Sequence, residues 1–423
     1  MTARFPLQDG QAELPTLNST HSYWHRDPSK KLLGHRTTES LPSTADVVVV
    51  GSGITGTFAA RELVAGGRGV VMLDAREACW GATGRPQNGG HCQPGVWDST
   101  PEVARFELAT FNLIKKLVVE HEISCDWHVV GGVHAIFSHE VLEAARKQIK
   151  RLQQYPDLRD KAALILDKHE LAAWHVPEAI AAVYQPNAAK CWPYKLVAWL
   201  LERLLGEHDA AAFNLQTNTP VEHLGRCGSS WIVHTRRGQI LARDVLLATN
   251  GYTSRLLPKM TGLIVPLPHS YVWMKGADHQ YLIHRGPEDI LAVPGGEEGI
   301  SRDDEVNPIL SRALHTSLQH VWTGIMGYSR DCNPWVGRVP TTLVRGPDTE
   351  SGTSGLWISA GYTGHGMPVA ALCGVAVAEM MLGKADGVQV PGQWLSSDER
   401  AERAREAQFP NTVEELLAML PAE

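Results

Sequence analysis

The fold is decided by residues 46–74, which read DVVVVGSGITGTFAARELVAGGRGVVMLD. The valines Val47–Val50 are β-branched and apolar, as in a strand that is buried on both faces. Three glycines follow in the pattern G-x-G-x-x-G, and a helix is predicted over Ile54–Ala65. A second strand, Gly69–Leu73, ends at the carboxylate of Asp74. This order of elements predicts a dinucleotide-binding unit; the alternative is a glycine-rich turn in another α/β fold.

Each glycine of this pattern has its own physical reason. Gly51 allows a sharp turn out of the strand, and Gly53 removes a side chain where a pyrophosphate approaches the backbone. Gly56 lets the helix pack closely on the sheet. The helix directs the positive end of its dipole at the phosphates, and Asp74 can accept hydrogen bonds from a ribose hydroxyl.

The composition argues against several classes of protein, including nucleic-acid-binding, membrane-spanning and disulfide-rich proteins. The 423 residues exceed one average domain, so two units are expected. A net charge of −7 gives no reason to expect nucleic acid or an anionic membrane as partner, and no apolar run approaches the ~20 residues of a membrane span. Seven scattered cysteines without a C-x-x-C pair argue against a disulfide framework or a metal site such as zinc. Without an apolar signal core or a peroxisomal tripeptide, a cytoplasmic location is expected.

A glycine-rich loop follows the second strand, over Cys79–Gly95. Its glycines and prolines exclude a regular helix or strand, and such a loop can bring backbone N–H groups against a flat ligand. Arg85 and His91 supply charge there, although a plain surface loop is the alternative. Residues 1–45 are polar and contain several prolines, so we expect an extended arm on the protein body without chemistry of its own.

Hydrophobic periodicity predicts the remaining elements. Helices are expected at Pro101–Ile123, Ser138–Leu152, Asp167–Trp174, Pro193–Leu205, Val306–His320 and Val413–Leu420. Strands are expected at Gly131–Phe137, Phe213–Thr217, Trp231–Thr235, Gln239–Leu241, Asp244–Ala248 and within residues 265–293. A second strand–turn–helix then occurs, with a strand at Leu356–Ala360, a glycine turn at Gly361–Met367 and a helix from Pro368 to Leu382. The dipole of that helix could serve the same ligand as the first one.

With these pieces in place, the chain resembles the D-amino-acid-oxidase superfamily of FAD-dependent amine oxidoreductases, and within it the γ-glutamylputrescine oxidase and sarcosine-oxidase branch. Four signatures carry the resemblance, namely the first glycine turn, Gly81–His91, Ala248–Gly251 and Gly361–Met367. It implies an α/β (α+β) two-domain fold, in which a Rossmann-like FAD-binding domain is interleaved with an antiparallel-sheet substrate domain. The FAD-binding domain would comprise 1–124, 191–260 and 321–423, and the substrate domain 125–190 and 261–320.

In that family one FAD lies extended along the Rossmann-like unit. The first turn would meet the pyrophosphate, the loop would flank the isoalloxazine, and the second turn would reach the ribityl chain and the pyrimidine edge. The resemblance therefore implies that the following residues contact FAD: Gly51, Gly53, Ile54, Thr55, Gly56, Asp74, Ala75, Arg76, Ala82, Thr83, Arg85, Asn88, Gly89, Gly90, His91, Val221, Ala248, Asn250, Gly251, Gly361, Thr363, Gly364, His365, Gly366 and Met367.

The chain departs from the family pattern in several places. Pro86-Gln87 is inserted in a loop that usually reads G-A-T-G-R-N-G-G-H. The insertion could change the shape of the protein surface that covers the flavin, or weaken the binding of FAD. Where some relatives carry a cysteine that bonds FAD covalently, this chain has Met326-Gly327-Tyr328, so non-covalent FAD is expected. Where sarcosine oxidases carry a lysine, this chain has Pro368, which leaves oxidase and dehydrogenase activity both open. The segment before Trp322 also looks shorter than in close relatives.

The resemblance implies that an amine or amino acid loses a hydride from its α-carbon to flavin N5 and becomes an imine. O2 is the expected electron acceptor, giving H2O2, and another acceptor is the alternative. His269, Tyr271 and Tyr328 are the candidate catalytic residues, and each could instead be an ordinary core residue. Arg85, or the dipole of the helix after Gly366, could stabilise the reduced flavin.

Two other functions fit fewer of these observations. An NAD(P)-dependent dehydrogenase would use the first glycine turn but would leave the second one unexplained. A degenerate flavoprotein that binds a partner without turnover is supported only by the Pro86-Gln87 insertion and the shortened segment. The sequence does not identify the substrate.

Overall fold

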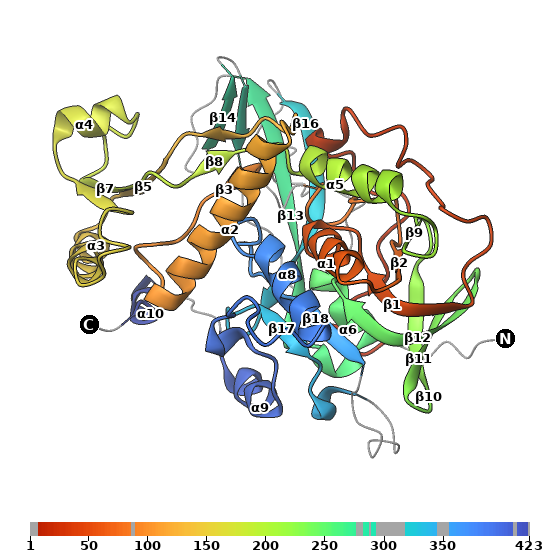
Figure 1. Ribbon diagram of the computed structural model, residues 1–423. Coiled ribbons are helices and arrows are strands. Elements are labelled where there is room, and N and C mark those ends of the chain that lie inside the picture. Colours follow the sequence, from red (N-terminus) through yellow and green to blue (C-terminus); the bar gives the residue numbers. More distant parts are fainter. Residues whose placement is uncertain are drawn as a thin grey trace. The chain divides into compact units, whose positions relative to one another are not determined.

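The computed structural model describes residues 7–85, 89–275, 282–286, 289–292, 318–344, 355–408 and 413–421 (Figure 1). The chain splits into two compact units, and each is described by itself. The first unit comprises Met1–Gly89, Trp192–Gly366 and Ala370–Gln408, and the second comprises Gly90–Cys191, Met367–Val369 and Phe409–Glu423. The predicted boundaries between an FAD-binding domain and a substrate domain concern function rather than compactness, and they stay a prediction.

The first unit is built on a sheet that is largely parallel at its centre. Its strands are β1 (Thr44–Val50), β2 (Val70–Leu73), β9 (Phe213–Gln216), β10 (Val221–Cys227), β11 (Ser230–Thr235), β12 (Gly238–Leu247), β17 (Trp335–Arg338) and β18 (Leu356–Ala360). β1 pairs in parallel with β2 and β12, and β12 pairs in parallel with β18. Val50, the last residue of β1, lies beside Leu73 and Leu247. Leu247 in turn lies beside Ile358, so the carboxyl ends of four strands reach one edge of the sheet.

The valines of β1 are buried on both faces of this sheet, as their uninterrupted apolar run predicts. Val48 and Val50 belong to a hydrophobic core together with residues of β11 and β12. Val49 points to the other face, where it lies against Gly56 of the first helix. The helices that pack on the strands include α1 (Ile54–Ala65), α5 (Pro193–Glu207) and α8 (Ala370–Met381). Of these, α1 packs against both α5 and α8.

A second, antiparallel sheet of the first unit runs in the order β14-β15-β13-β16. Its strands are β13 (Ile264–Lys275), β14 (Leu282–Gly286), β15 (Asp289–Ala292) and β16 (Leu318–Ser329). The sheet predicted within residues 265–293 is confirmed for the described residues. The helix predicted over Val306–His320 is wrong at its end, because Leu318–His320 pair with Trp273 and Met274 as the start of β16. Residues 306–317 lie outside the described part of the chain.

The second unit combines helices with two small antiparallel sheets. Its helices are α2 (Pro101–Glu120), α3 (His139–Leu152), α4 (Lys168–Ala173) and α10 (Val413–Ala418). Its sheets run in the orders β5-β7-β6 and β3-β8-β4, with strands β3 (His91–Cys92), β4 (His128–Val129), β5 (Gly132–Ile136), β6 (Ala163–Ile165), β7 (Ala181–Gln185) and β8 (Ala189–Lys190). Side chains of Thr100, Ser138 and Asp167 cap α2, α3 and α4, so the predicted starts at Ser138 and Asp167 are confirmed.

Short elements complete the first unit: η1 (Tyr23–His25), η2 (Asn250–Tyr252), α6 (Thr253–Leu256), η3 (Pro258–Met260), η4 (Thr341–Leu343), η6 (Gly392–Trp394) and α9 (Asp398–Glu406). The predictions missed several strands, among them β6, β7, β10 and β17. They also divided β12 into Gln239–Leu241 and Asp244–Ala248, which is wrong because pairing with β1 continues across Ala242. The helices predicted from Pro101, Pro193 and Pro368 are confirmed, with ends that differ by a few residues.

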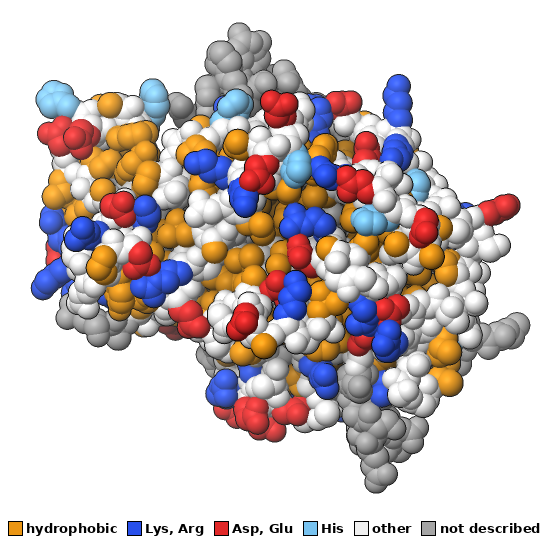
Figure 2. All heavy atoms as spheres, in the orientation of Figure 1, with side chains coloured by type: hydrophobic (Ala, Val, Ile, Leu, Met, Phe, Trp, Pro, Cys, Tyr) orange, Lys and Arg blue, Asp and Glu red, His pale blue; other side chains and the backbone are white. Residues whose placement is uncertain are grey.

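The surface of the described residues gives two further facts. No helix among them combines the length and the hydrophobicity that crossing a bilayer requires. Figure 2 shows acidic and basic side chains interspersed with apolar ones on the face in view. Charge of either sign is therefore spread over that face rather than concentrated in one field.

Candidate cofactor site

Four strands of the first unit end at one edge of the sheet, and each is followed by a segment that the sequence predicted to contact a cofactor. Gly51 follows β1, Asp74 follows β2, Ala248 follows β12 and Gly361 follows β18. The backbone ties these ends together, since the N–H of Gly51 donates to the carbonyl of Leu73 at 2.8 Å. Ligands of open α/β sheets bind outside the carboxyl ends of the strands, so this edge is the candidate site.

The first glycine turn is held by sterics close to its own backbone. Gly51 has a φ of +108°, in the left-handed region that favours glycine. A Cβ on Gly56 would collide with the carbonyl of Gly51, so only glycine lets α1 approach the turn this closely. The hydroxyl of Thr83 accepts a hydrogen bond from the N–H of Ile54 at 3.0 Å, and a Cβ on Gly53 would lie 3.1 Å from the same oxygen. The loop after β2 thus caps the helix that follows β1.

Asp74 connects the same two segments through its carboxylate. One oxygen accepts from the N–H and the hydroxyl of Ser52, at 2.9 and 2.5 Å, and the other accepts from the N–H of Arg76 at 3.0 Å. Burial raises the pKa of Asp74, and these hydrogen bonds oppose the shift. The hydroxyl of Ser52 also accepts from the N–H of Cys79 at 2.8 Å. The acid predicted to bind a ribose therefore already organises the turn around it.

The second glycine turn is held by side chains from elsewhere in the chain. Gly361 and Thr363 both have left-handed backbones, with φ of +79° and +50°. The side-chain oxygen of Asn250 accepts from the N–H groups of Gly361 and Tyr362, at 3.1 and 3.4 Å. The N–H of Thr363 donates to the carbonyl of Gly327 at 2.8 Å. The conformation of this turn thus depends on β16 and on the segment after β12.

A buried hydroxyl contact links the two turns directly. The phenol of Tyr362 lies 2.8 Å from the hydroxyl of Thr55, in the first turn of α1, and 2.9 Å from that of Ser359. Burial raises the pKa of Tyr362 far above its usual value, so the phenol stays protonated. A Cβ on Gly374 would collide with the carbonyl of Thr55, so α8 also approaches α1 backbone to backbone. Sequence reasoning missed this link, because Tyr362 stands inside a motif that was interpreted only as a glycine turn.

The segment Ala248–Gly251 lies between the two turns. A Cβ on Gly51 would lie 2.6 Å from the carbonyl of Ala248, while Asn250 bonds the second turn as described. Asn250 itself has a φ of +45°, which asparagine tolerates better than most residues. The three segments therefore form one continuous edge.

The N-terminal arm packs against the loop after β2. Trp24 is fully buried, and its carbonyl accepts from the indole of Trp192 at 2.8 Å. The ring of His25 stacks on Trp80 with 4.5 Å between ring centres. Arg85, predicted to flank the flavin, is buried and donates to the carbonyl of Thr20 in the arm. The arm is thus part of the packing around the loop, with a short 3-10 turn where an extended segment was expected.

Of the three candidate catalytic residues, Tyr328 lies against the second turn. A Cβ on Gly364 would lie 3.1 Å from its phenol oxygen, and burial raises the pKa of Tyr328. His269 and Tyr271 belong to β13, where the register sets them opposite Gly324 and Trp322 of β16. Their side chains lie outside the described part of the structure, so their catalytic roles stay predictions.

The other predicted contacts fall into three groups. The loop after β2 contains Ala75, Arg76 and Ala82, with Gly89 at its far end. Val221 is buried at the start of β10. The turns after β12 and β18 contain Gly251, His365 and Gly366. Gly90, His91 and Met367 belong to the second unit, where His91 pairs with Lys190. Asn88 and the inserted Pro86-Gln87 lie outside the described residues.

The residues at this edge fit an elongated dinucleotide. The positive end of the α1 dipole favours an anion at the first turn, where Gly53 presents no side chain, and Asp74 provides an acceptor beyond it. The second glycine turn, before α8, lies at the same edge of the sheet. Among the described residues, no group of three or more His, Cys, Asp and Glu side chains is arranged to hold a metal ion.

Comparison with known proteins agrees with this geometry. The family model described as "FAD dependent oxidoreductase" (DAO) matches residues 46–380. The probable oxidoreductase OrdL of Rhizobium meliloti is 26% identical over 374 residues, covering 80% of this chain and 83% of that protein. The γ-glutamylputrescine oxidoreductase of Escherichia coli is 24% identical over 410 residues, covering 87% and 90%.

A solved structure shows the same fold. The L-proline dehydrogenase from P. horikoshii superposes with a TM-score of 0.68 at 21% identity, covering 87% of this chain and all of that one. The family inferred from the four sequence signatures is confirmed by the family model, and the relatives are consistent with the expected branch.

Proposed function

This chain belongs to the DAO family of FAD-dependent oxidoreductases, and from that premise we propose that it oxidises a C–N bond of an amine or amino acid to an imine, with O2 as electron acceptor. One observation carries the proposal most strongly. Two glycine turns far apart in the sequence lie at one sheet edge and are joined by the 2.8 Å contact between Thr55 and Tyr362. A nicotinamide-dependent enzyme would have no use for the second turn.

The first unit would hold FAD along this edge. The backbone of Gly51–Gly56 and the dipole of α1 would bind the pyrophosphate, and Asp74 would accept from the adenosine ribose. The turn Gly361–Gly366 would contact the flavin end. FAD held there would supply the two-electron redox chemistry between the α-carbon of the substrate and O2, the proposed acceptor.

The side chains of this chain would orient the amine and keep it neutral. A neutral amine gives up a hydride more readily than an ammonium, and a desolvated pocket favours the neutral form. Tyr328 has a raised pKa, first from burial and then from the neighbouring Cys332, so its phenol stays protonated at neutral pH. It would therefore donate a hydrogen bond rather than act as a base. His269 and Tyr271, on the neighbouring strand, remain candidates for substrate contact.

The relatives support amine chemistry without identifying the substrate. One is described as a γ-glutamylputrescine oxidoreductase and one neighbour as an L-proline dehydrogenase, and both names denote substrates with a C–N bond. Met326-Gly327-Tyr328 stands where some relatives carry a flavin-linked cysteine, so the FAD would be non-covalent. Pro368, in place of a lysine, supports an acceptor other than O2 as the second candidate.

An anaerobic titration tests the proposal. Protein reconstituted with FAD is mixed with a panel of amines and amino acids, and the visible flavin band is followed. We expect one class of amine to bleach the band and air to restore it with release of H2O2. Bleaching without recovery in air would favour the dehydrogenase alternative, and no bleaching by any amine would contradict the proposed reaction while leaving the family intact.

Replacing Tyr328 with Phe tests its role within this reaction. The loss of one neutral hydrogen bond to substrate predicts a rate of flavin reduction lowered by about 10-fold. Tyr184→Phe, a partly buried tyrosine of β7 in the second unit, is the control and should leave the rate unchanged. Equal rates for wild type and Tyr328→Phe would remove Tyr328 from the candidates.

A further inference from the structure

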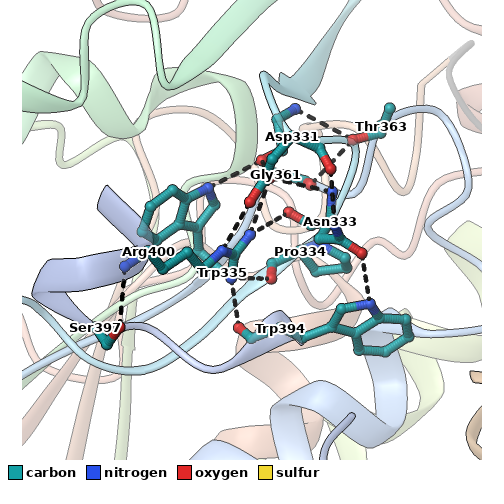
Figure 3. Close-up of polar contacts among 10 residues, drawn as sticks. Asp331, Asn333, Pro334, Trp335, Gly361, Thr363, Trp394, Ser397 and Arg400 are labelled. Carbon is teal, nitrogen blue, oxygen red and sulfur yellow. Dashed lines mark hydrogen bonds and ion pairs between the residues drawn. The ribbon is translucent and has the colours of Figure 1, made fainter. Parts of the chain in front are cut away.

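A buried arginine, Arg400, hydrogen-bonds to residues of the segment 331–334, which precedes the strand pair leading to the second glycine turn. Arg400 lies in α9, beyond residue 380 where the family match ends, and its side chain is 3% exposed. Its Nε and Nη2 atoms donate to the two carboxylate oxygens of Asp331, at 2.9 and 3.1 Å. Its other hydrogen bonds go to the carbonyls of Asn333, Pro334 and Trp394, at 2.7, 2.8 and 2.6 Å (Figure 3). A planar guanidinium bonded in this way fixes the orientation of several groups at once.

The same guanidinium belongs to a closed network. Its central carbon lies 4.0 Å from the centre of the Trp335 ring. The indole N–H of Trp335 donates to the hydroxyl of Ser329 at 2.9 Å, and that hydroxyl donates to Asp331 at 2.7 Å. Since Ser329 and Trp335 are fully buried, losing one member leaves the others without a water molecule to replace it.

Two routes lead from this network to the glycine turn. The N–H of Ser329 donates to the hydroxyl of Thr363 at 3.1 Å. Trp335 pairs with Ala360 across β17 and β18, and a Cβ on Gly361 would lie 3.4 Å from its ring. The turn is therefore held at its first residue and at its third by groups that Arg400 positions.

The third residue is the one that most needs support. Thr363 is β-branched and has a φ of +50°, which is a rare conformation for such a residue. A conformation of this kind persists only where the surroundings over-determine it. We propose that Arg400 is a positioning residue for FAD, which sets the geometry of the turn Gly361–Gly366 through Ser329 and Trp335. The proposal rests on FAD binding, which follows from the family, and not on the amine chemistry proposed above.

A purely structural role for Arg400 makes a different prediction. If the arginine only anchored α9, its loss would lower the melting temperature of the protein without changing the binding of FAD by the folded molecule. If it positions the turn, the folded molecule binds FAD more weakly. The two roles are therefore separated by measuring the FAD dissociation constant and the stability of the apoprotein independently.

The test uses the full-length apoprotein and three variants. Arg400→Met removes the charge and the donors, and Arg400→Lys retains the charge without the planar fork. Arg405→Met is the matched control, since Arg405 lies on the same helix but is exposed and makes one hydrogen bond, to the carbonyl of Lys259. FAD binding is titrated by flavin fluorescence at a temperature at which circular dichroism shows each variant folded.

We expect Arg400→Met to weaken FAD binding by about 10- to 100-fold, as the loss of a buried charged hydrogen-bond network implies. Arg400→Lys should fall between Arg400→Met and wild type, and the visible spectrum of the bound flavin should shift in both. Arg405→Met should bind within about twofold of wild type. Binding by folded Arg400→Met within about twofold of wild type, whatever its melting temperature, would overturn the proposal.

A second variant keeps the proposal testable if Arg400→Met does not fold. Ser329→Ala removes the hydroxyl that connects the arginine's partners, at a position that no predicted cofactor contact occupies. It should weaken FAD binding by about 5-fold, and in combination with Arg400→Lys the loss should be smaller than the product of the two single losses. Unchanged binding by Ser329→Ala, or independent effects, would contradict the route through Ser329. A wild-type protein that binds no FAD would instead overturn the family's cofactor for this chain.

Discussion

The two glycine turns of this protein have the same outline, strand, turn and helix, but they are stabilised in different ways. The turn Gly51–Gly56 is shaped by its own backbone, since a Cβ on Gly56 would collide with the carbonyl of Gly51, and it is bonded by Asp74 and Thr83 from the next part of the chain. The turn Gly361–Gly366 is held by residues distant in the sequence, by Asn250 directly and, in the proposal above, by Arg400 through Ser329 and Trp335. The same motif can thus be recognised in the sequence at two places, although its conformation depends on local sterics at one and on tertiary contacts at the other.

The difference extends to the residues themselves. In the first turn glycine stands wherever a side chain would strike backbone. In the second turn Thr363 adopts a left-handed backbone that glycine would adopt freely, and its hydroxyl is bonded by Ser329. The first turn should therefore fail when a single methyl group is added, and the second when a distant partner is removed.

The sharpest way to test the local turn is Gly56→Ala. The added methyl group would meet the Gly51 carbonyl and Val49, and backbone cannot move aside cheaply, so we expect a loss of about 3 kcal/mol or more in the free energy of unfolding. FAD binding should be lost with it. Thermal and denaturant unfolding of the apoprotein measure the effect.

Gly206→Ala is the matched control for this change. Gly206 also lies in a helix, but a Cβ there would meet nothing within 4 Å, so alanine should stabilise the protein by about 0.5–1 kcal/mol. If both substitutions shift stability by similar amounts, the first turn is not held by the close approach described here.

The remote support of the second turn is tested at Asn250. Asn250→Ala removes the acceptor for two backbone N–H groups of the turn, which predicts a loss of about 2 kcal/mol and a weaker FAD complex. Asn250→Asp keeps an acceptor oxygen and tolerates the same backbone, so it should retain most of the binding. Equal losses in the two variants would contradict the role of the acceptor oxygen, because Asn250→Asp retains it.

The link between the turns is tested by Tyr362→Phe. Removing the phenol oxygen leaves the hydroxyls of Thr55 and Ser359 buried with one partner fewer, which predicts a loss of about 1–1.5 kcal/mol. Adding Thr55→Val to this variant removes both partners of the contact and should restore part of the stability. If the double variant is less stable than Tyr362→Phe by the full cost of Thr55→Val alone, the two hydroxyls are not coupled.

The smallest effect concerns the arm over the first turn's loop, and it depends on pH. Burial, and then the positive charges of Arg85 and Arg76, lower the pKa of His25 well below its usual value, against a smaller opposing contact with the backbone of Cys79. The unfolded chain binds a proton near pH 6.5 while the folded protein does not, so stability is complete above that pH and is lost as the pH falls. Between pH 7 and 6 this group alone should cost about 0.7 kcal/mol.

His25→Gln should flatten that part of the stability–pH curve. Denaturant midpoints at several pH values between 7 and 5 provide the measurement. An unchanged slope in His25→Gln would mean that the buried ring does not titrate differently in the folded protein.

The contrast between the turns also explains what the sequence could predict. The first turn, α1 and β2 were predicted closely, because they follow Val47–Val50 in one continuous strand–turn–helix–strand unit. The second turn was predicted as a turn, but its supports were not, since nothing near Gly361 in the sequence indicates Asn250 or Arg400. The contact of Tyr362 with Thr55 of α1 could be found only in the three-dimensional structure.

The missed strands follow the same logic. β7 is AAVYQ, and alanine has low β-propensity, yet pairing on both sides with β5 and β6 makes it a strand. β10 contains Gly225 and several polar residues, and it is a strand because it pairs with β11 at the sheet edge. At Leu318–His320 a weak helical pattern was outweighed by pairing with β13. For β7 and Leu318–His320 the pairing partner is distant in the sequence, whereas for β10 it is the next strand of a hairpin.

The contact between Thr55 and Tyr362 joins positions 307 residues apart, which has a consequence for how the protein is made. At roughly 5–20 residues per second, about 15–60 seconds of synthesis separate the emergence of the two residues from the ribosome. During that interval the nascent chain exposes the face of α1 that α8 later covers. We therefore expect newly made protein to need protection by chaperones until α8 and α9 emerge, and to take up its flavin only after they have done so.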